Sequence, residues 1–547
     1  MYDHHMVLQR APLSASVWGF VRLSAGTSVR VTLEREDGHG KTIAVDADMT
    51  PFNTSHEVWK AILPPVVVAS REDGEEEVYS SYKITALTDR ADFSNATLRD
   101  VLFGEVWLCS GQSNMAFLVE NAFGGPELVQ DANNYMNIRL FTSRKLRANR
   151  PLRDLGERTI DNRTWISGVE LPWSRASNVS ISQSNAREAQ ETDTHGRVLD
   201  DNWLYMSAVC YLYGKELYSS LRVPIGLVST NWGGTVIEAW SSRHVLETCG
   251  RPTENETLMY TELYNAMIAP FMNLTIRGAV WYQGESNSAH ADDYACLLPQ
   301  MVADWRIGWR EGSGTTDPSF PFGVVQLAAD AGTSLSLPYF RWAGQTQGHG
   351  SLPNEKLPNS FFATAYDLGD AQSPFGCVHT RYKKEVGQRL ALAARRSVYG
   401  ESIHVQPLAR LSDVVGEEEN DGASYVVRIP FDDSGSHGLL LSLPINVSKT
   451  IVATNWDGTT PFEVCVVDED KDSSASCDAS GQFDSWAFPT ETSLEADAST
   501  IVLRGDGPVP LAVRYAWRAY PCEFEGCGVR STAERIPPAP FHAYVRR

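Results

Sequence analysis

Two serines follow a run of strand-forming residues near position 110. The segment GEVWLCSGQSNMAF, residues 104–117, begins as a buried-strand pattern and turns polar around Ser110 and Ser113. In open α/β sheets, ligands bind at the carboxyl ends of the strands. Ser113 also opens a helical stretch, where backbone N–H groups favour a developing negative charge. A lone serine there is more simply explained as a helix cap, so a catalytic role depends on its companions.

A serine nucleophile needs a base within hydrogen-bond reach, and histidine is the usual base near neutral pH. Of the 12 histidines, His244, His290, His349 and His379 fall near the loops of the expected sheet. His379 follows the last expected strand through a short loop and precedes a helix. It is therefore the preferred base, and His290, just after QGES, is second.

Acyl transfer also needs hydrogen-bond donors that face the developing oxyanion. The segment STNWGGTVIEAW supplies Gly233 and Gly234, whose backbone amides can approach a ligand closely because glycine has no Cβ. The segment WYQGESN supplies the side-chain amide of Asn287. A turn would explain the glycines equally well, and a helix cap would explain the asparagine. Together, however, four expected strand ends carry serine, glycine, asparagine and histidine in that order.

This order is the block order of the SGNH hydrolases, and within that superfamily the chain resembles the sialate O-acetylesterases. The matching words cover nearly the whole chain: MVLQR, VLFGEVWLCSGQSNM, YMSAVCYLYGKELY, PIGLVSTNWGGTVIEAWSS, NAMIAP, VWYQGESN, PFGVVQL, SPFGCVH and RYAWRAYPCEFEGC. The resemblance implies removal of O-acetyl groups, chiefly the 9-O-acetyl of sialic acids, without a metal or organic cofactor. It also implies a lysosomal or secreted glycoprotein.

Carried over position by position, the resemblance makes Ser113 the nucleophile and His379 the general base, then the general acid. Ser110 would support the turn. The implied oxyanion hole comprises the amide of Ser113, Gly233 or Gly234, and Asn287.

One position departs from the pattern of the superfamily. Many SGNH hydrolases place an orienting aspartate three residues before the histidine, and here that position is Gly376. We favour Asp370 as the third catalytic residue because it is nearest to His379 in sequence. Asp367, Glu285 or a backbone carbonyl are alternatives, the last of which would leave a Ser–His dyad.

The pattern along the chain predicts an α/β fold, with a parallel sheet covered by helices on both faces and flanked by β modules. The resemblance implies that this is an SGNH-type three-layer α/β/α hydrolase domain. Short apolar runs at 104–110, 223–230, 277–284, 321–328 and 361–369 suit strands buried on both faces. Helical patterns lie between them, with Met206, Val209, Cys210, Tyr213 and Leu217 on one face, and Val386, Leu390 and Ala393 on another. The expected domains are an N-terminal β-sandwich at 1–100, a hydrolase domain at 101–400 and a C-terminal β domain at 401–547. A polar stretch at about 145–200 reads as an irregular insertion.

Composition limits the partners and the compartment. The formal charge of −21 disfavours nucleic acid and anionic membrane surfaces. No apolar run is long enough to span a bilayer, and no secretory signal is visible. Nine cysteines, with Cys465/Cys477 and Cys522/Cys527 closely spaced, suggest local disulfides and leave at least one cysteine over. Seven glycosylation triplets begin at Asn53, Asn95, Asn162, Asn178, Asn255, Asn273 and Asn446. We therefore expect a lysosomal or secreted protein.

Two rival functions remain. An esterase for another acetylated glycan, such as xylan, would use the same catalytic residues. A non-catalytic glycan-binding protein would lack Ser113 or His379, and both are present. A metal-dependent hydrolase has little support because HEVWK at 56–60 lacks the second histidine of HExxH.

Overall fold

The computed structural model describes residues 1–547 except 23–26, 54, 69–78, 90–94, 156–167, 185–202, 256, 331–335, 433–437, 444–459, 467–476 and 481–485. The chain divides into two compact units. The first comprises Met1–Trp281 and Gln300–Phe322, and the second comprises Tyr282–Pro299 and Gly323–Arg547. The expected domains at 1–100, 101–400 and 401–547 are a different partition of the chain and stay a prediction.

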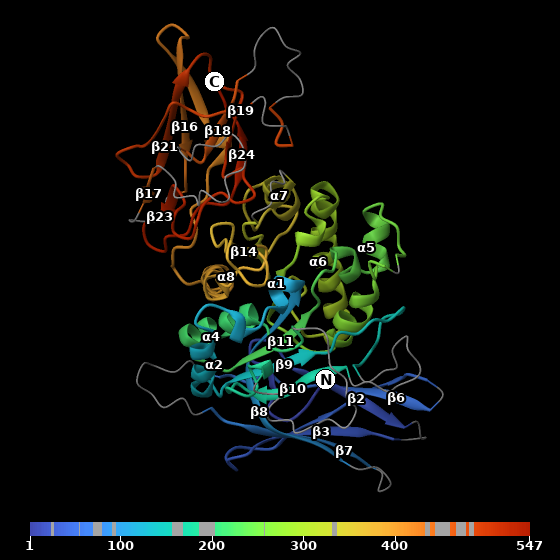
Figure 1. Cartoon of the computed structure of the whole chain (residues 1–547). Helices are drawn as coiled ribbons and strands as arrows, with labels where there is room; N and C mark the ends of the chain where they lie inside the picture. The colour runs from blue at the N-terminus through green and yellow to red at the C-terminus, as the bar shows by residue number, and fades with distance from the viewer. Residues whose placement is uncertain are drawn as a thin grey trace. The chain divides into compact units, whose positions relative to one another are not determined.

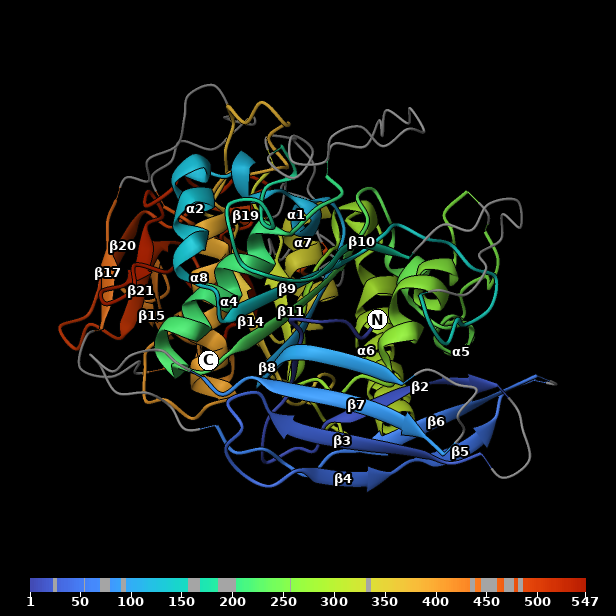
Figure 2. The same ribbon diagram turned by 90° about the horizontal axis from the view of Figure 1, so that it is seen from below.

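The N-terminal part of the first unit is a β module, as the sequence predicts. Its strands are β1 (Val7–Gln9), β2 (Ser16–Arg22), β3 (Val29–Arg35), β4 (Ile43–Asp46), β5 (Asp48–Pro51), β6 (His56–Ile62) and β7 (Tyr82–Thr88). One sheet has the order β2-β6-β5, and β3 pairs antiparallel with β4 and β7. Strands β2 to β7 are drawn in shades of blue in Figures 1 and 2.

A single long strand, β8 (Ala96–Gly111), joins this module to the parallel sheet. Its first part pairs antiparallel with β7, and its second part, from Glu105 to Gly111, pairs parallel with β11 (Ile225–Asn231). In the first unit the strand order is β10-β9-β11-β8-β12. The last residues of β8 are fully buried, as the apolar run at 104–110 predicts for a strand covered on both faces. The fold is thus mixed α/β, with a central, largely parallel sheet and additional β modules.

Three of the remaining strands of the sheet match the other apolar runs, and two were not predicted. They are β9 (Ile138–Ser143), β10 (Val169–Arg175), β12 (Gly278–Tyr282), β13 (Phe322–Gln326) and β14 (Ser360–Thr364). The strands without a predicted run are β9, which pairs parallel with β11, and β10, which lies in the stretch expected to be irregular and pairs antiparallel with β9. Residues 156–167 and 185–202 of that stretch lie outside the described residues.

The helices are α1 (Ser113–Ala116), α2 (Gly125–Asp131), α4 (Ala208–Leu221), α5 (Arg243–Thr248), α6 (Ala291–Ser313), α7 (Ser336–Tyr339) and α8 (Lys383–Ser397). The hydroxyl of Ser207 caps α4 by accepting a hydrogen bond from the N–H of Cys210. Helix α4 packs against β11, and α8 packs against β14. The apolar faces expected on both helices are buried. No described helix is long and apolar enough to cross a membrane.

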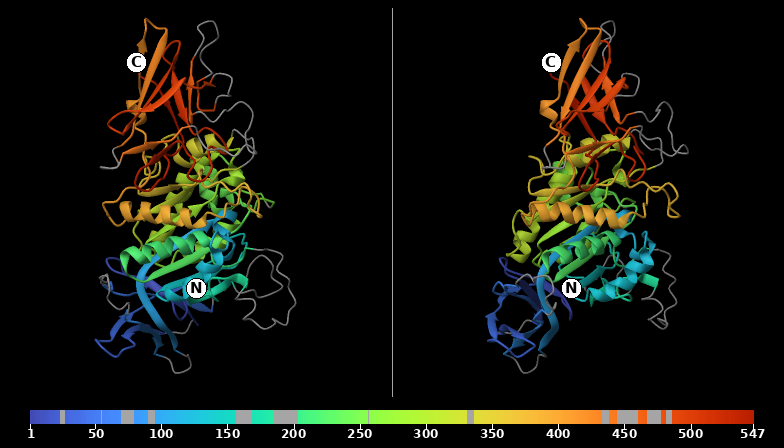
Figure 3. Two further views of the ribbon diagram at one scale, coloured as in Figure 1. Left: turned by 60° about the vertical axis from the view of Figure 1, so that its left-hand side comes forward. Right: turned by 90° about the vertical axis from the view of Figure 1, so that its left-hand side faces the viewer.

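In the second unit, the C-terminal strands form two four-stranded sheets and one two-stranded sheet (Figure 3). The orders are β15-β16-β21-β20, β19-β18-β22-β24 and β17-β23. Their bounds are β15 (Val415–Glu419), β16 (Ser424–Pro430), β17 (Leu439–Leu441), β18 (Phe462–Cys465), β19 (Trp486–Ala487), β20 (Glu491–Leu494), β21 (Thr500–Asp506), β22 (Ala512–Tyr515), β23 (Val529–Ser531) and β24 (Phe541–Tyr544). Trp342 and Tyr366 belong to the same apolar core as these strands.

A buried arginine ties the end of β13 to the C-terminal module. The Arg341 guanidinium donates to the carbonyls of Leu327 and Ala328, and also to those of Arg518 and Ala519. Since Arg341 is completely buried, these carbonyls replace the water that the charge would otherwise require.

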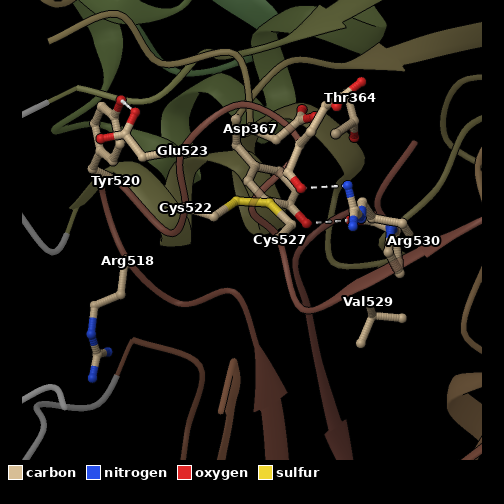
Figure 4. The surroundings of a disulfide bond; sticks show 12 residues. Thr364, Asp367, Arg518, Tyr520, Cys522, Glu523, Cys527, Val529 and Arg530 are labelled. Carbon is tan, nitrogen blue, oxygen red and sulfur yellow. Dashed lines mark hydrogen bonds between the residues drawn. A yellow bond between two sulfur atoms is a disulfide. The ribbon is translucent and has the colours of Figure 1, made fainter. Parts of the chain in front are cut away.

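Disulfides reinforce both units. The sequence predicts the local pairs Cys465–Cys477 and Cys522–Cys527, and the structure confirms both; Figure 4 shows the second of them. Spacing does not predict the bond between Cys109 in β8 and Cys210 in α4, which are 101 positions apart. Cys377 remains a thiol.

The long-range disulfide should contribute more to stability than the short one. A chain-entropy argument gives roughly 5 kcal/mol for closing a loop of 101 residues and roughly 3 kcal/mol for one of 12. We expect Cys109→Ala/Cys210→Ala to lower the thermal midpoint further than Cys465→Ala/Cys477→Ala, as measured by calorimetry. An equal or smaller shift for the first pair would contradict this expectation.

Candidate active site

The carboxyl end of β8 presents one of the two candidate serines. Ser110 lies inside β8 and is completely buried, and no described residue forms a hydrogen bond with its hydroxyl. Ser113 follows the end of the strand, begins α1 and is only partly buried. Because a nucleophile must reach its substrate, the geometry favours Ser113 over Ser110.

The neighbouring strand end brings a glycine against Ser113. Strands β8 and β11 pair in parallel register up to Gly111 and Asn231, and the N–H of Trp232 binds the carbonyl of Gly111. A Cβ added to Gly233 would lie 3.2 Å from the Cβ of Ser113 and 3.4 Å from its Cα. The backbone of Gly233 therefore lies directly beside the candidate nucleophile.

Gly234 has a different role in the turn. Its φ of +74° lies in the left-handed region, where residues with a Cβ are strained. The pair thus combines a close approach at Gly233 with a turn conformation at Gly234.

Asn287 in the second unit has a fixed amide orientation. It ends the short helix η6 (Glu285–Asn287) that follows β12, and it is 3% exposed. Its Oδ1 accepts a hydrogen bond of 2.7 Å from Nε2 of Gln283. Since the carbonyl side of the amide faces Gln283, the Nδ2 donors face elsewhere, as an oxyanion donor requires.

His379, also in the second unit, is held by its own loop. Its Nδ1 lies 2.7 Å from the carbonyl oxygen of Phe375, and its carbonyl accepts a hydrogen bond from the Ser373 hydroxyl. The turn passes through Gly376 at a φ of +90°, and the N–H of His379 binds the carbonyl of Gly376. Because a carbonyl only accepts, Nδ1 must carry the proton, and Nε2 of the neutral ring is then an acceptor.

The partner of Nδ1 differs from the one favoured on sequence grounds. Both carboxylate oxygens of Asp370 bind Arg381, at 2.6 Å from Nε and 3.0 Å from Nη2. Asp367 is likewise engaged by Arg389, at 2.6 and 2.7 Å. The backbone carbonyl, one of the alternatives left open, occupies the position expected for Asp370. The geometry therefore favours Phe375 as the orienting group and gives Asp370 a role in fixing the loop through Arg381.

Burial keeps the imidazole of His379 neutral at pH 7. Loss of solvent lowers the pKa of His379 below its ordinary 6.5, and the carbonyl of Phe375 opposes this effect. The charge of Lys383 lowers the same pKa, whereas Asp330 raises it. A neutral imidazole with an accepting Nε2 is the form in which histidine acts as a base.

Lys383 was not anticipated from the sequence. It is completely buried, and its ammonium lies 5.5 Å from the ring centroid of Tyr282. Burial lowers the pKa of Lys383 to about 7, although Glu285 and Asp370 partly oppose this. The only sequence feature that distinguishes Lys383 is its position in HTRYKK, four residues after His379. A lysine in such a segment is ordinarily predicted to be exposed.

Next to His379 in the chain, Val378 lines a cavity of about 170 Å³. Glu285 and Asp330 contribute carboxylates to this cavity, and Ser288 and Ser336 contribute hydroxyls. Such a lining suits the hydroxyl groups of a sugar and repels a carboxylate. Within the described part of the chain, no group of His, Cys, Asp and Glu side chains is arranged to hold a metal ion.

Comparisons with known proteins point to the same family along nearly the whole chain. Residues 175–396 match the family described as carbohydrate esterase, sialic acid-specific acetylesterase, and residues 442–545 match the sialate O-acetylesterase C-terminal domain. The sialate O-acetylesterase of Mus musculus is 34% identical, covering 99% of this chain and 93% of that protein. The human sialate O-acetylesterase is 32% identical, with coverage of 99% and 91%. A carbohydrate acetylesterase from Xanthomonas citri has a similar structure, with a TM-score of 0.68, 26% identity, and coverage of 99% of this chain and 97% of that one.

The electrostatics of His379 can be tested by titration. We expect its pKa, followed by NMR of ring-labelled histidine and assigned by difference from His379→Gln, to lie below 6.5. Replacing Lys383 by Gln removes a positive charge that disfavours the imidazolium, so the pKa of His379 should rise. Lys384→Gln is the matched control, because Lys384 is exposed and should leave the titration unchanged. A lower pKa in Lys383→Gln would contradict the assigned sign.

Proposed function

The chain belongs to the sialate O-acetylesterase family, and we propose that it removes O-acetyl groups, chiefly the 9-O-acetyl, from sialic acids through a serine acyl-enzyme. It is a carboxylic ester hydrolase. The observation that supports the serine mechanism best is the packing of Gly233 against Ser113 at the end of β8. The accepting Nε2 of His379 supplies the base that such a serine needs.

In the proposed first half-reaction, Oγ of Ser113 attacks the acetyl carbonyl carbon while Nε2 of His379 takes the hydroxyl proton. The carbonyl oxygen becomes an oxyanion, and the N–H groups of Ser113 and Gly233 or Gly234, with Nδ2 of Asn287, donate to it. When the tetrahedral intermediate collapses, the bond to the sugar oxygen breaks. His379 then returns the proton to that oxygen, which releases the sugar and leaves acetyl-Ser113.

The second half-reaction consumes one water. His379 takes a proton from the water as its oxygen attacks the acetyl carbonyl, and the same donors bind the second oxyanion. Collapse breaks the bond to Oγ, which regains its proton from His379, and acetic acid leaves and ionises to acetate in solution. The mechanism requires Oγ of Ser113 and Nε2 of His379 to come within hydrogen-bond reach.

The carbonyl of Phe375 does the orienting work that a carboxylate performs in many serine hydrolases. It fixes the tautomer and the ring direction, but it carries no full negative charge to stabilise the imidazolium. The lowered pKa of His379 is consistent with such a neutral partner. Asp370 is assigned to the loop, where it holds Arg381.

The cavity beside Val378 is the proposed position for hydroxyl groups of the substrate. Carboxylates of Glu285 and Asp330 can accept hydrogen bonds from a polyol, whereas the carboxylate of a sialic acid would be repelled there. The substrate would therefore bind with its carboxylate directed away from this cavity.

A second candidate substrate is another acetylated glycan, which the similarity to the Xanthomonas citri carbohydrate acetylesterase favours. The same catalytic residues would serve, so the two substrates differ only in how the pocket accepts them. Parallel assays with 9-O-acetylated sialic acid and acetylated xylan decide between them through kcat/KM.

We also propose that the protein is a lysosomal or secreted glycoprotein. Asn53, Asn95 and Asn255 are exposed, as glycosylation requires, and the disulfides suit an oxidising compartment. Asn162 and Asn446 lie outside the described residues.

Removal of the nucleophile tests the mechanism. We expect Ser113→Ala to lower kcat for 9-O-acetyl-N-acetylneuraminic acid by at least about 10³-fold, because no other group can form the acyl-enzyme. Ser110→Ala is the control, and its kcat should match the wild type because the Ser110 hydroxyl is buried. Full activity in Ser113→Ala would refute the serine mechanism, whichever ester is used.

Replacement of Asp370 separates the two possible orienting groups. Loss of an orienting aspartate costs on the order of 10⁴-fold in kcat in serine proteases. If Phe375 orients His379, Asp370→Asn should lose far less, while the thermal midpoint falls because the ion pair between the buried Asp370 and the partly exposed Arg381 is broken. Arg381→Met should lower the midpoint similarly. A 10⁴-fold loss confined to Asp370→Asn would restore Asp370 as the third member of a triad.

A further inference from the structure

The N-terminal β module has one strand edge that no described strand covers. β2 pairs only with β6, so its other side is an edge of the sheet β2-β6-β5. The carbonyl of Ala15 accepts from the N–H of Leu63, which follows β6. Ser16 is turned the other way, since its N–H binds Oγ1 of Thr275 and its carbonyl accepts from the Tyr2 hydroxyl. The N–H and C=O groups of Ser16 thus point away from β6, toward the open edge of the sheet.

Backbone groups of an antiparallel strand alternate between its two sides. Those of Trp18, Phe20 and Arg22 therefore face the same open edge as those of Ser16. Among the described residues, none forms a hydrogen bond with the N–H or C=O groups of these three residues on that side. The edge thus offers a row of unused donors and acceptors, spaced as a further strand would need them.

A cavity of about 810 Å³ lies along this edge. Six consecutive residues of β2, Val17–Arg22, line it. Side chains of a strand alternate between its faces, so six in a row can line one cavity only where the backbone edge faces it. Val29, Trp59, Ile84 and Leu98, from the strands opposite and beside β2, supply apolar surface.

β2 also lacks the devices that usually protect an edge strand, which are lysine, proline and bulges. Its sequence SVWGFVR contains neither residue, and all seven positions pair with β6 in unbroken register. The opposite edge of the same sheet, β5, is only four residues long and contains Asp48 and Pro51. Figure 2 shows both strands in the blue module. The β5 edge of this sheet therefore has features that discourage pairing with a further strand, and the β2 edge does not.

The charge around the cavity selects the kind of partner. Arg22 is exposed, and among the described residues it has no ion pair or side-chain hydrogen bond. His56 lies opposite Arg22 across β2 and β6 and also lines the cavity, whereas no described lining residue is acidic. In a chain of net charge −21, this is a local site for an anionic side chain.

We propose that an extended, acidic peptide segment of a partner protein adds to β2 as a further strand. Its backbone pairs with Trp18, Phe20 and Arg22, its apolar side chains enter the cavity, and one carboxylate binds Arg22. The site lies outside the proposed catalytic residues and does not depend on ester hydrolysis.

The test uses the full chain and a fluorescein-labelled peptide, Thr-Val-Thr-Val-Glu-Val-Thr, followed by fluorescence anisotropy. A second peptide of identical side chains, N-methylated at alternate residues, cannot form the strand ladder. We expect the first peptide to bind and the N-methylated peptide to bind at least tenfold more weakly. Equal binding of the two peptides, or no binding of the first, overturns the proposal.

Variants of the protein test the charge contact at Arg22 and the backbone pairing at Phe20 separately. Arg22→Gln should weaken binding of the Glu peptide but not of a Glu-to-Gln peptide, and Arg30→Gln is the matched control, since Arg30 pairs with Asp46 outside the cavity lining. Phe20→Pro removes one outward N–H, while Phe20→Ala removes only the ring, so a larger loss with proline supports strand addition. No effect of Arg22→Gln, or an equal effect of both Phe20 variants, counts against it.

Two further readouts separate this proposal from others. Hydrolysis of a small acetyl ester should be unchanged in the Arg22 and Phe20 variants, so a failed esterase assay and a failed peptide assay are distinguishable. Sedimentation should show the same oligomeric state for the wild type and Phe20→Pro. Self-association that disappears in Phe20→Pro would mean that a second copy covers the edge, and would overturn the proposed peptide partner.

Discussion

The parallel register between β8 and β11 is the constraint on which the position of the candidate nucleophile depends. The paired segments, 105–111 of β8 and 225–231 of β11, are buried, so water cannot compete for the backbone hydrogen bonds that fix their alignment. The register ends at Gly111 and Asn231, and the turns beyond these residues bring Gly233 against Ser113. The disulfide between Cys109 and Cys210 then anchors the end of β8 to α4. The proposed nucleophile thus lies two residues beyond the end of a buried strand of the sheet.

The proposed base, in the second unit, depends on a loop whose own residues hold it in place. His379 is oriented by the carbonyl of Phe375, and the Asp370–Arg381 pair holds the ends of the same loop together. Buried Lys383 follows directly and adds a positive charge that favours the neutral imidazole. A short segment therefore sets both the direction and the protonation state of the proposed base.

Sequence patterns predicted two kinds of feature: strands that are buried, and polar residues that follow the ends of those strands. The apolar runs predicted β8, β11, β12, β13 and β14, and the polar segments after two of these strands contain Ser113 and Gly233, which the structure brings together. The sequence could not predict which group binds Nδ1 of His379, because every residue has a backbone carbonyl. The burial of Lys383 and the pairing of Cys109 with Cys210 depend on tertiary packing, which spacing does not encode. Strand β10 was not predicted because its residues, VELPWSR, alternate in polarity but include a proline within a largely polar stretch.

The central claim is that Ser113 is a nucleophile activated by His379. Its most direct measurement is covalent labelling with an organophosphonate that reacts only with activated serines, mapped by peptide mass spectrometry in the wild type and in His379→Gln. The account predicts one modified residue, Ser113, in the wild type and no modification in His379→Gln. A label on another residue, or equal labelling of Ser113 in both proteins, would contradict it.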